Sequence, residues 1–185
     1  MLLKTNLTKT PTQMFSKNLV RIKYIQRIQL DIENSEANKK LLKIDFLNKM
    51  YIFQLVAFWQ VFIEDLAKSG IWLENIHNDK LKQMNLKKEK LDAQLKKFNT
   101  PSRKNIDKLF KDVFEIPKLS NSWESDNLKR SRATSSLSIL LKSRHEIAHT
   151  GNTKTQWSYE KNFQMMRTLL CIAELTENAF NKLEK

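Results

Sequence analysis

The residues best suited to chemistry lie together in one short segment, Arg144-His145-Glu146-Ile147-Ala148-His149. A guanidinium can hold a phosphate and stabilise the charge that develops on it, and an imidazole titrates near neutrality. Arg144 and His149, with four residues between them, could therefore cleave RNA through attack by its own 2′-hydroxyl. Such a reaction needs no metal and spares DNA, which lacks that nucleophile. We call residues 144–149 the Arg-x4-His motif.

The same residues also permit a second interpretation, a zinc hydrolase, because His145, Glu146 and His149 form a His-Glu-x-x-His pattern. Histidines four residues apart share a helix face, and the glutamate could activate water. Gly151 argues against this hypothesis because it ends the helix almost at once, and no sheet edge is predicted to hold a peptide. The zinc would also need a third ligand, for which the candidates are Glu174, Glu177 and His77.

The elements that position these residues are predicted to be helices, so the fold class is all-α. Two glycines and three prolines are too few for a turn-rich β protein. Gly70 is interpreted as the C-terminal stop of the second helix. Apolar residues at helical spacing predict about five to six helices, over residues 12–33, 37–68, 79–98, 101–114, 129–148 and 156–183.

Within the helix that carries the motif, an apolar stripe of Leu137, Leu140 and Leu141 leads to Arg144. We therefore expect the Arg144 guanidinium to face packed protein and to need a partner such as a carboxylate or a phosphate. His149 lies five residues further on, about 140° around an ideal helix. The two side chains share a face only if the helix ends between them, as Gly151 suggests.

A net charge of +13 predicts an anionic partner, most simply nucleic acid. Residues 1–30 contain basic residues and no acid, and we interpret residues 1–35 as a basic helical extension. Residues 36–185 would then form the core bundle of a single domain. Candidate contacts to the RNA backbone are Lys87, Lys88, Lys90, Arg130 and Arg132.

Other features limit the setting and the chemistry. The single Cys171 excludes an internal disulfide and fits a reducing compartment, so we expect a cytoplasmic protein. The most apolar stretch, residues 50–63, is too short to span a bilayer and is interpreted as a buried core helix rather than a membrane segment. The sequence contains no glycine-rich phosphate loop, so a nucleotide-hydrolysing engine is not expected, and neither is a cofactor or a bound metal.

The motif, followed by Thr150-Gly151, resembles the signature of HEPN-domain ribonucleases: an arginine, a polar residue, three variable residues and a histidine. Residues 58–66, residues 98–110 and the pair Ser122-Trp123 resemble segments of the branch known as RiboL-PSP-HEPN. The resemblance covers roughly residues 40–152 and leaves the first 35 residues outside. Gln60 stands where many relatives carry an acid.

The resemblance implies a HEPN-like helical bundle that dimerises, with two copies of the motif facing each other in one composite cleft. It implies metal-independent RNA cleavage, often by a toxin or an antiviral effector. Arg144 would stabilise the phosphate, His149 would act as acid and base, and His145 would give polar support. Glu64, as a partner for Arg144, and Glu146 are further supporting candidates.

The implied partners are RNA, a second copy of the chain and an antitoxin or other regulatory protein. A competing hypothesis is a HEPN-like module that binds RNA or protein without cutting. These two hypotheses differ in one testable respect. A change at Arg144 or His149 abolishes activity in an enzyme, whereas it only weakens binding in a binding module.

Overall fold

The structure, a computed structural model, describes residues 9–77 and 81–183. In these ranges the regular structure is helical apart from one isolated antiparallel bridge between Ser125 and Leu128, which confirms the all-α prediction. A short 3-10 helix, η1 (Leu119–Ser122), precedes the fifth helix. The helices are α1 (Pro11–Glu33), α2 (Lys40–His77), α3 (Leu81–Leu95), α4 (Arg103–Phe114), α5 (Arg130–Thr150) and α6 (Tyr159–Leu183).

Helix α1 is anchored to the bundle at its first residues. Thr10 caps it in a capping box with Gln13, and Pro11 occupies the first turn, where its missing N–H costs nothing. The Glu177 carboxylate of α6 accepts hydrogen bonds from Thr10 Oγ1 at 3.1 Å and from the Thr12 N–H at 3.0 Å. Its negative charge lies at the helix N-terminus, where the helix dipole favours an anion.

The body of α1 packs against α2 and α6 and contributes Phe15, Leu19 and Ile22 to the buried core. The description of residues 1–35 as an extension is therefore wrong for residues 11–33. The basic side chains of α1 occupy only its outer face, and the apolar face belongs to the bundle.

Two buried tryptophans join the helices to the loops between them. Trp59 of α2 donates its indole N–H to the Pro101 carbonyl at 3.1 Å, just before α4 begins. Trp123, which follows η1, donates to Thr176 Oγ1 of α6 at 2.9 Å. The two indole rings meet edge to face, with centroids 6.3 Å apart. These contacts fix the segment before α4 against α2, which matters for the site described below.

Gly70 does not end the second helix, as the sequence had suggested, because α2 continues to His77. A Cβ added at Gly70 would lie 2.5 Å from Phe180 Cζ and 2.8 Å from Phe114 Cε1. The glycine is therefore present because two aromatic rings approach the backbone closely. A glycine required by packing and a glycine required by a helix end look alike in sequence.

Helix α2 is long and apolar enough, by length and composition over Lys40–Ile71, to cross a membrane. Its position in the bundle accounts for this hydrophobicity, because α2 contacts α1, α3, α5 and α6. The side chains that it buries completely include Tyr51, Ile52, Leu55, Trp59 and Ile63.

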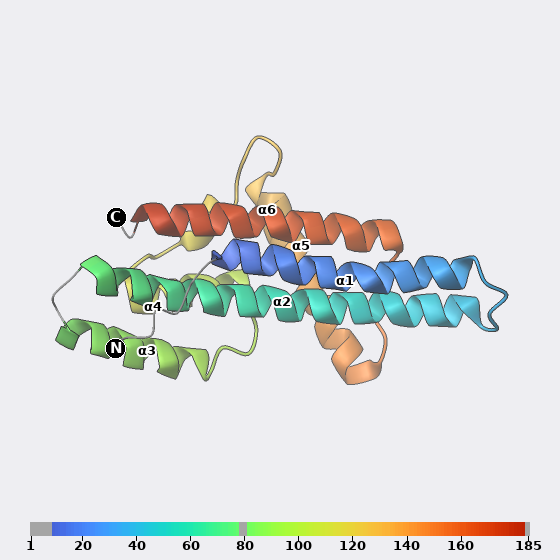
Figure 1. Cartoon of the computed structure of the whole chain (residues 1–185), viewed down its shortest axis with the longest axis horizontal. Helices are drawn as coiled ribbons and strands as arrows, with labels where there is room; N and C mark the ends of the chain where they lie inside the picture. The colour runs from blue at the N-terminus through green and yellow to red at the C-terminus, as the bar shows by residue number, and fades with distance from the viewer. Residues whose placement is uncertain (1–8, 78–80, 184–185) are drawn as a thin grey trace.

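Helix α5 crosses the long helices, whereas α1 runs beside α2 and α6 (Figure 1). The N-terminal end of α5 emerges beyond α6, and its C-terminal end emerges beyond α2. The two ends of α5 therefore face different surroundings, and the Arg-x4-His motif occupies the end beyond α2.

Candidate active site

The C-terminal end of α5 is closed by a left-handed residue. Gly151 has φ 68° and donates its N–H to the Ile147 carbonyl at 2.9 Å. Nothing lies within 4 Å of the position that a Cβ would take, so the backbone conformation, and not crowding, requires glycine here. Gly151 therefore ends α5 as predicted, directly after the motif.

Glu146 holds the turn that follows the helix. Its carboxylate accepts hydrogen bonds from Thr153 Oγ1 at 2.7 Å and from the Lys154 N–H at 3.1 Å. These two hydrogen bonds keep the pKa of Glu146 below its usual value, and the bond from Thr153 has the larger effect. Glu146 thus shapes the turn beside the motif.

Arg144 differs from its prediction because its side chain is exposed. The guanidinium lies over the ring of Phe53 on α2, with Cζ 5.2 Å from the ring centroid. Among the described residues, no carboxylate forms an ion pair with it. The apolar stripe of α5 is buried at Leu137, Leu140 and Ile147, but Arg144 lies at the edge of this face beside Phe53 and is exposed.

The candidate partner Glu64 does not meet Arg144. It accepts a hydrogen bond from Gln60 Nε2 at 3.0 Å, and the same amide nitrogen lies 3.1 Å from the Phe98 carbonyl. Glu64 is eleven residues beyond Phe53, about 16 Å along α2. The prediction of a Glu64–Arg144 pair is therefore wrong.

The two histidines of the motif lie close together on consecutive turns of α5. The rings of His145 and His149 have centroids 4.4 Å apart, and both side chains are exposed. Because α5 remains helical through Thr150, the helix does not end between Arg144 and His149, as the sequence had suggested. These two residues consequently project from different faces of one chain, about 140° apart.

A pocket of about 800 Å³ lies between α2, α5 and the segment 99–104. Arg144 and His145 line it, together with three basic residues that were not predicted from the sequence: Arg103, Lys104 and Lys142. Among the described residues, no carboxylate lines it. We call this cavity the basic pocket. Its charge favours an anionic ligand.

One signal could have revealed part of the basic pocket. Helix α4 begins with Arg103 and Lys104 and has no acid in its first turn, where the helix dipole disfavours cations. Charges placed against this preference suggest a role other than helix stability. That Lys142 joins them across the pocket depends on tertiary structure and could not be read from the sequence.

The residues predicted to bind the RNA backbone lie away from the motif. Arg130 sits at the other end of α5, about 20 Å from Arg144 along the axis, and contacts Asn121 Oδ1 at 3.0 Å and Glu124 Oε2 at 3.4 Å. Arg132 is exposed near that end. The remaining three, which belong to α3 and do not line the basic pocket, are Lys87, Lys88 and Lys90.

The zinc hypothesis lacks a third ligand in the part of the chain that the structure describes. No group of three His, Cys, Asp or Glu side chains converges there. Glu177, one candidate, is bound to the start of α1, and Glu146 is engaged by the turn after α5. The side chain of the upstream candidate His77 lies outside the described residues.

Comparison with known families now identifies the fold. The family described as RiboL-PSP-HEPN matches residues 16–181. The chain belongs to this HEPN family. The match extends well beyond residues 40–152 on both sides and includes most of α1 and α6, in agreement with the packing of α1 into the bundle. No curated protein and no solved structure matches the chain.

HEPN membership indicates a ribonuclease-like or nucleotide-binding function. HEPN domains often bind RNA and dimerise. In this HEPN chain the exposed motif and the basic pocket lie side by side, because Arg144 and His145 belong to both.

Proposed function

We propose that this HEPN protein is a metal-independent endoribonuclease whose active site is completed by a second copy of the chain. The observation that carries the proposal is the exposed Arg144, which forms no ion pair with a described carboxylate and lies in an intact Arg-x4-His motif. A permanently charged guanidinium without a carboxylate partner is free to bind a phosphate.

The chemistry assigned to these residues is transesterification. One His149 takes the proton of the 2′-hydroxyl, and the oxygen attacks the adjacent phosphorus. The bond from phosphorus to the 5′-oxygen breaks, and the protonated His149 gives its proton to that oxygen, so that one His149 acts first as base and then as acid. The products are a 2′,3′-cyclic phosphate and a 5′-hydroxyl. Arg144 stabilises the charge on the phosphate oxygens, and His145 supports His149 from the preceding turn.

Two features support a homodimer. First, Arg144 and His149 of one chain project from different faces of α5, so a second copy can bring the missing group. Second, an apolar stripe on α2 leads to the motif. Phe46 is 59% exposed and lies seven residues before Phe53, hence on the same face of α2 and about 10 Å away. Leu42, 66% exposed, continues this stripe.

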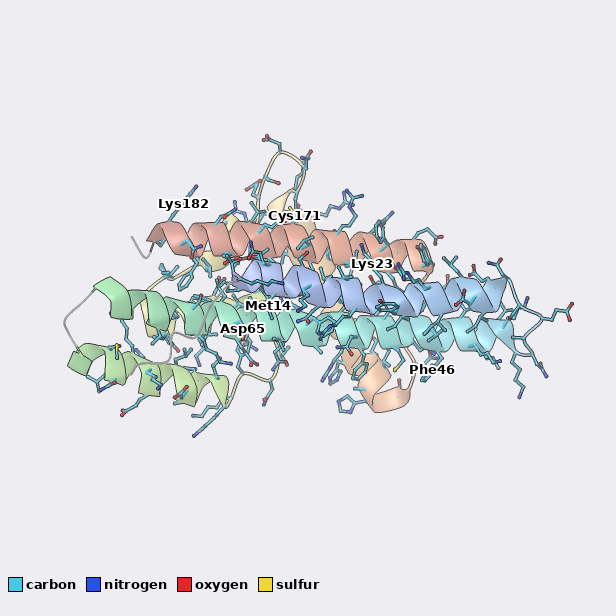
Figure 2. The ribbon with its side chains drawn as sticks, in the orientation of Figure 1. Met14, Lys23, Phe46, Asp65, Cys171 and Lys182 are labelled. Carbon is cyan, nitrogen blue, oxygen red and sulfur yellow. The ribbon has the colours of Figure 1, made fainter. Side chains whose placement is uncertain are left out.

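Figure 2 shows Phe46 on the side of α2 from which the C-terminal end of α5 emerges. A second copy packed over Leu42 and Phe46 would bury the stripe and place the two motifs together. Phe46→Glu is therefore expected to weaken the dimer at least tenfold in sedimentation experiments. Val20→Glu, at an equally exposed apolar position on α1, is the matched control.

The biological setting that fits this activity is a cytoplasmic toxin or antiviral effector that cuts RNA and is restrained by an antitoxin or other regulatory protein. The net charge of +13 supports RNA as the partner. In cells, expression of the wild-type chain should arrest growth, whereas expression of the His149→Ala chain should not.

The deciding experiment is cleavage of a single-stranded RNA by purified protein in excess EDTA, with His149→Ala in parallel. We expect cleavage by the wild type only, with loss of cleavage where a single 2′-deoxynucleotide replaces the reactive one. Cleavage that requires added zinc, or that survives the His149 change, would contradict the proposal.

A mixing experiment tests the composite site. Chains with Arg144→Ala and chains with His149→Ala are each inactive, but a mixed dimer contains one intact pair of Arg144 and His149. Part of the activity should return on mixing. Absence of activity in isolated heterodimers would show that each chain forms its own site.

The basic pocket also favours a second candidate, an RNA-binding HEPN module that does not cut. Such a module would bind RNA through the pocket cations and show no cleavage under any metal condition. Changes at Arg144 or His149 would then only weaken RNA binding.

A further inference from the structure

The basic pocket combines two kinds of surface. Its floor is apolar and includes Val56 and Leu137, both buried in the core, with Ala57 and Leu141 beside them. Its rim is cationic. At about 800 Å³ the pocket is far larger than a phosphate ion needs and falls in the range of cavities that hold small organic ligands.

The cations come from two walls. Arg103 and Lys104 begin α4 on one side, and Lys142 and Arg144 belong to α5 on the other. None of the four forms an ion pair within the described residues. An anion between the walls would meet positive charge from both, and no carboxylate of the described residues lines the pocket to compete with it.

The segment that carries the first wall is held rigidly. Pro101 is buried and its carbonyl accepts the Trp59 indole N–H, while Asn105 Nδ2 donates to the Thr100 carbonyl at 2.8 Å. Ser102 caps α4 by accepting the Asn105 N–H. The pocket is thus preformed, so binding would require little ordering of the chain.

We propose that the basic pocket is a subsite for one nucleotide of the RNA substrate, next to the phosphate that is cut. The base lies on the apolar floor, and the attached phosphate lies between the α4 and α5 walls. An apolar platform beside a cationic rim matches a nucleotide, which has an apolar ring face beside its charge. This inference rests on the proposed function, because Arg144 and His145 line both the pocket and the motif.

Charge reversal at the rim gives the first test. RNA affinity is measured in the cleavage-deficient His149→Ala chain, so that binding is observed without cutting. Lys104→Glu and Lys142→Glu should each weaken binding about tenfold and lower the salt slope by about one. Lys108→Glu, one turn after Lys104 on α4, exposed and outside the pocket, makes the same charge change and should alter affinity less than threefold.

Filling the floor gives the second test. Ala57 is exposed and lines the pocket, so Ala57→Trp should occupy the space without disturbing the core. Val61→Trp, one turn along the same face of α2 and outside the pocket, is the control. In the active chain we expect Ala57→Trp to raise KM about tenfold with a smaller change in kcat, and Val61→Trp to change neither.

An abasic nucleotide moved along the RNA gives the third test. One position beside the cleavage site should lose about tenfold in affinity, and this loss should vanish in the Ala57→Trp chain. An equal loss of affinity at every position of the abasic nucleotide would overturn the subsite. It would also be overturned if Ala57→Trp behaved like Val61→Trp and the two pocket lysine variants behaved like Lys108→Glu. The proposal would also be overturned if uridine or adenosine monophosphate bound in the pocket but the pocket variants left the affinity for RNA unchanged.

The outcomes also separate this inference from the proposed function. If the wild type cuts no RNA but RNA binding depends on Lys104 and Ala57 as described, the subsite stands and the nuclease fails. If the wild type cuts RNA and the pocket variants behave like Lys108→Glu and Val61→Trp, the nuclease stands and the subsite fails.

Discussion

Two polar clusters lie along α2 and use their hydrogen-bonding groups in opposite ways. Around the buried Asn48, Oδ1 accepts from Gln29 Nε2 at 2.8 Å and from Asn162 Nδ2 at 2.7 Å, and Nδ2 donates to the Trp157 carbonyl at 3.1 Å. About 8 Å further along α2, Phe53 carries the exposed Arg144 on its ring. The first cluster joins α1, α2, α6 and the segment after the motif.

This difference distinguishes the polar groups that stabilise the fold from those that can bind a ligand or take part in a reaction. The buried Asn48 finds its partners inside the protein, because an unmet hydrogen bond there costs free energy. An exposed guanidinium or imidazole is solvated and can exchange water for a ligand. The Asn48 cluster joins the helices to the segment after the motif. Arg144, His145 and His149, which we call the exposed cluster, keep their bonding capacity for a ligand.

The largest expected effect comes from the exposed cluster. Arg144→Ala should lower the RNA cleavage rate by about a hundredfold or more, because one donor to the developing charge is lost. The melting temperature should hardly change, since the side chain is exposed. Arg130→Ala, at the other end of α5, should leave cleavage within about twofold of wild type. If Arg144→Ala and Arg130→Ala lowered the cleavage rate equally, the motif would have no special role in cleavage.

The next effect comes from the buried cluster. Asn48→Leu removes three hydrogen bonds and leaves the amides of Gln29 and Asn162 with unmet donors. We expect a loss of about 2–4 kcal/mol in the free energy of unfolding, measured in urea. The cleavage rate per folded molecule should stay near wild type. A stable but inactive Asn48→Leu protein would contradict the claim that Asn48 contributes to stability and not to cleavage.

A smaller effect concerns the ring beneath Arg144. Phe53→Leu keeps an apolar side chain but removes the aromatic face, a contact worth about 0.5–1 kcal/mol at an exposed site. Cleavage should fall about two- to fivefold, and the remaining activity should show the same pH profile. Phe58→Leu, also half-buried on α2 and distant from the motif in register, serves as the control.

The smallest effect concerns the turn after α5. The pKa of Glu146 is lowered in the folded chain, so its contribution to stability is complete above the ordinary carboxyl pKa and is lost as pH falls through the lowered value. Thr153→Val removes the larger cause and should raise the Glu146 pKa in an NMR titration. The pKa of Glu160, lowered by its own N–H and by Ser158, should not move.

Much of the fold could be predicted from local sequence. Gly151 marked the end of α5, and the spacing of apolar residues indicated each helix of the described residues. These signals depend on hydrogen bonding within a few residues of the chain. Gly70 was misread because its cause, the approach of Phe180, lies over a hundred residues away.

The candidate site was predicted in part. The motif gave the residue types and their spacing, and the family match covers all of it. The exposure of Arg144 could not be predicted from the leucine stripe, because the stripe does not show which of its positions lie at the edge of the buried face. The basic pocket joins residues 99–104 to Lys142, and that closeness is a result of how α5 crosses the bundle.

Gly70 has a consequence for anyone who wishes to make this protein more heat-resistant. Exchanging a helix-interior glycine for alanine is a common stabilising substitution, worth about 1 kcal/mol through chain entropy and helix propensity. At Gly70 the added methyl group would meet two aromatic rings at less than 3 Å. The usual thermostabilising exchange would therefore lower the melting temperature here, and a library built by that rule should leave this position unchanged.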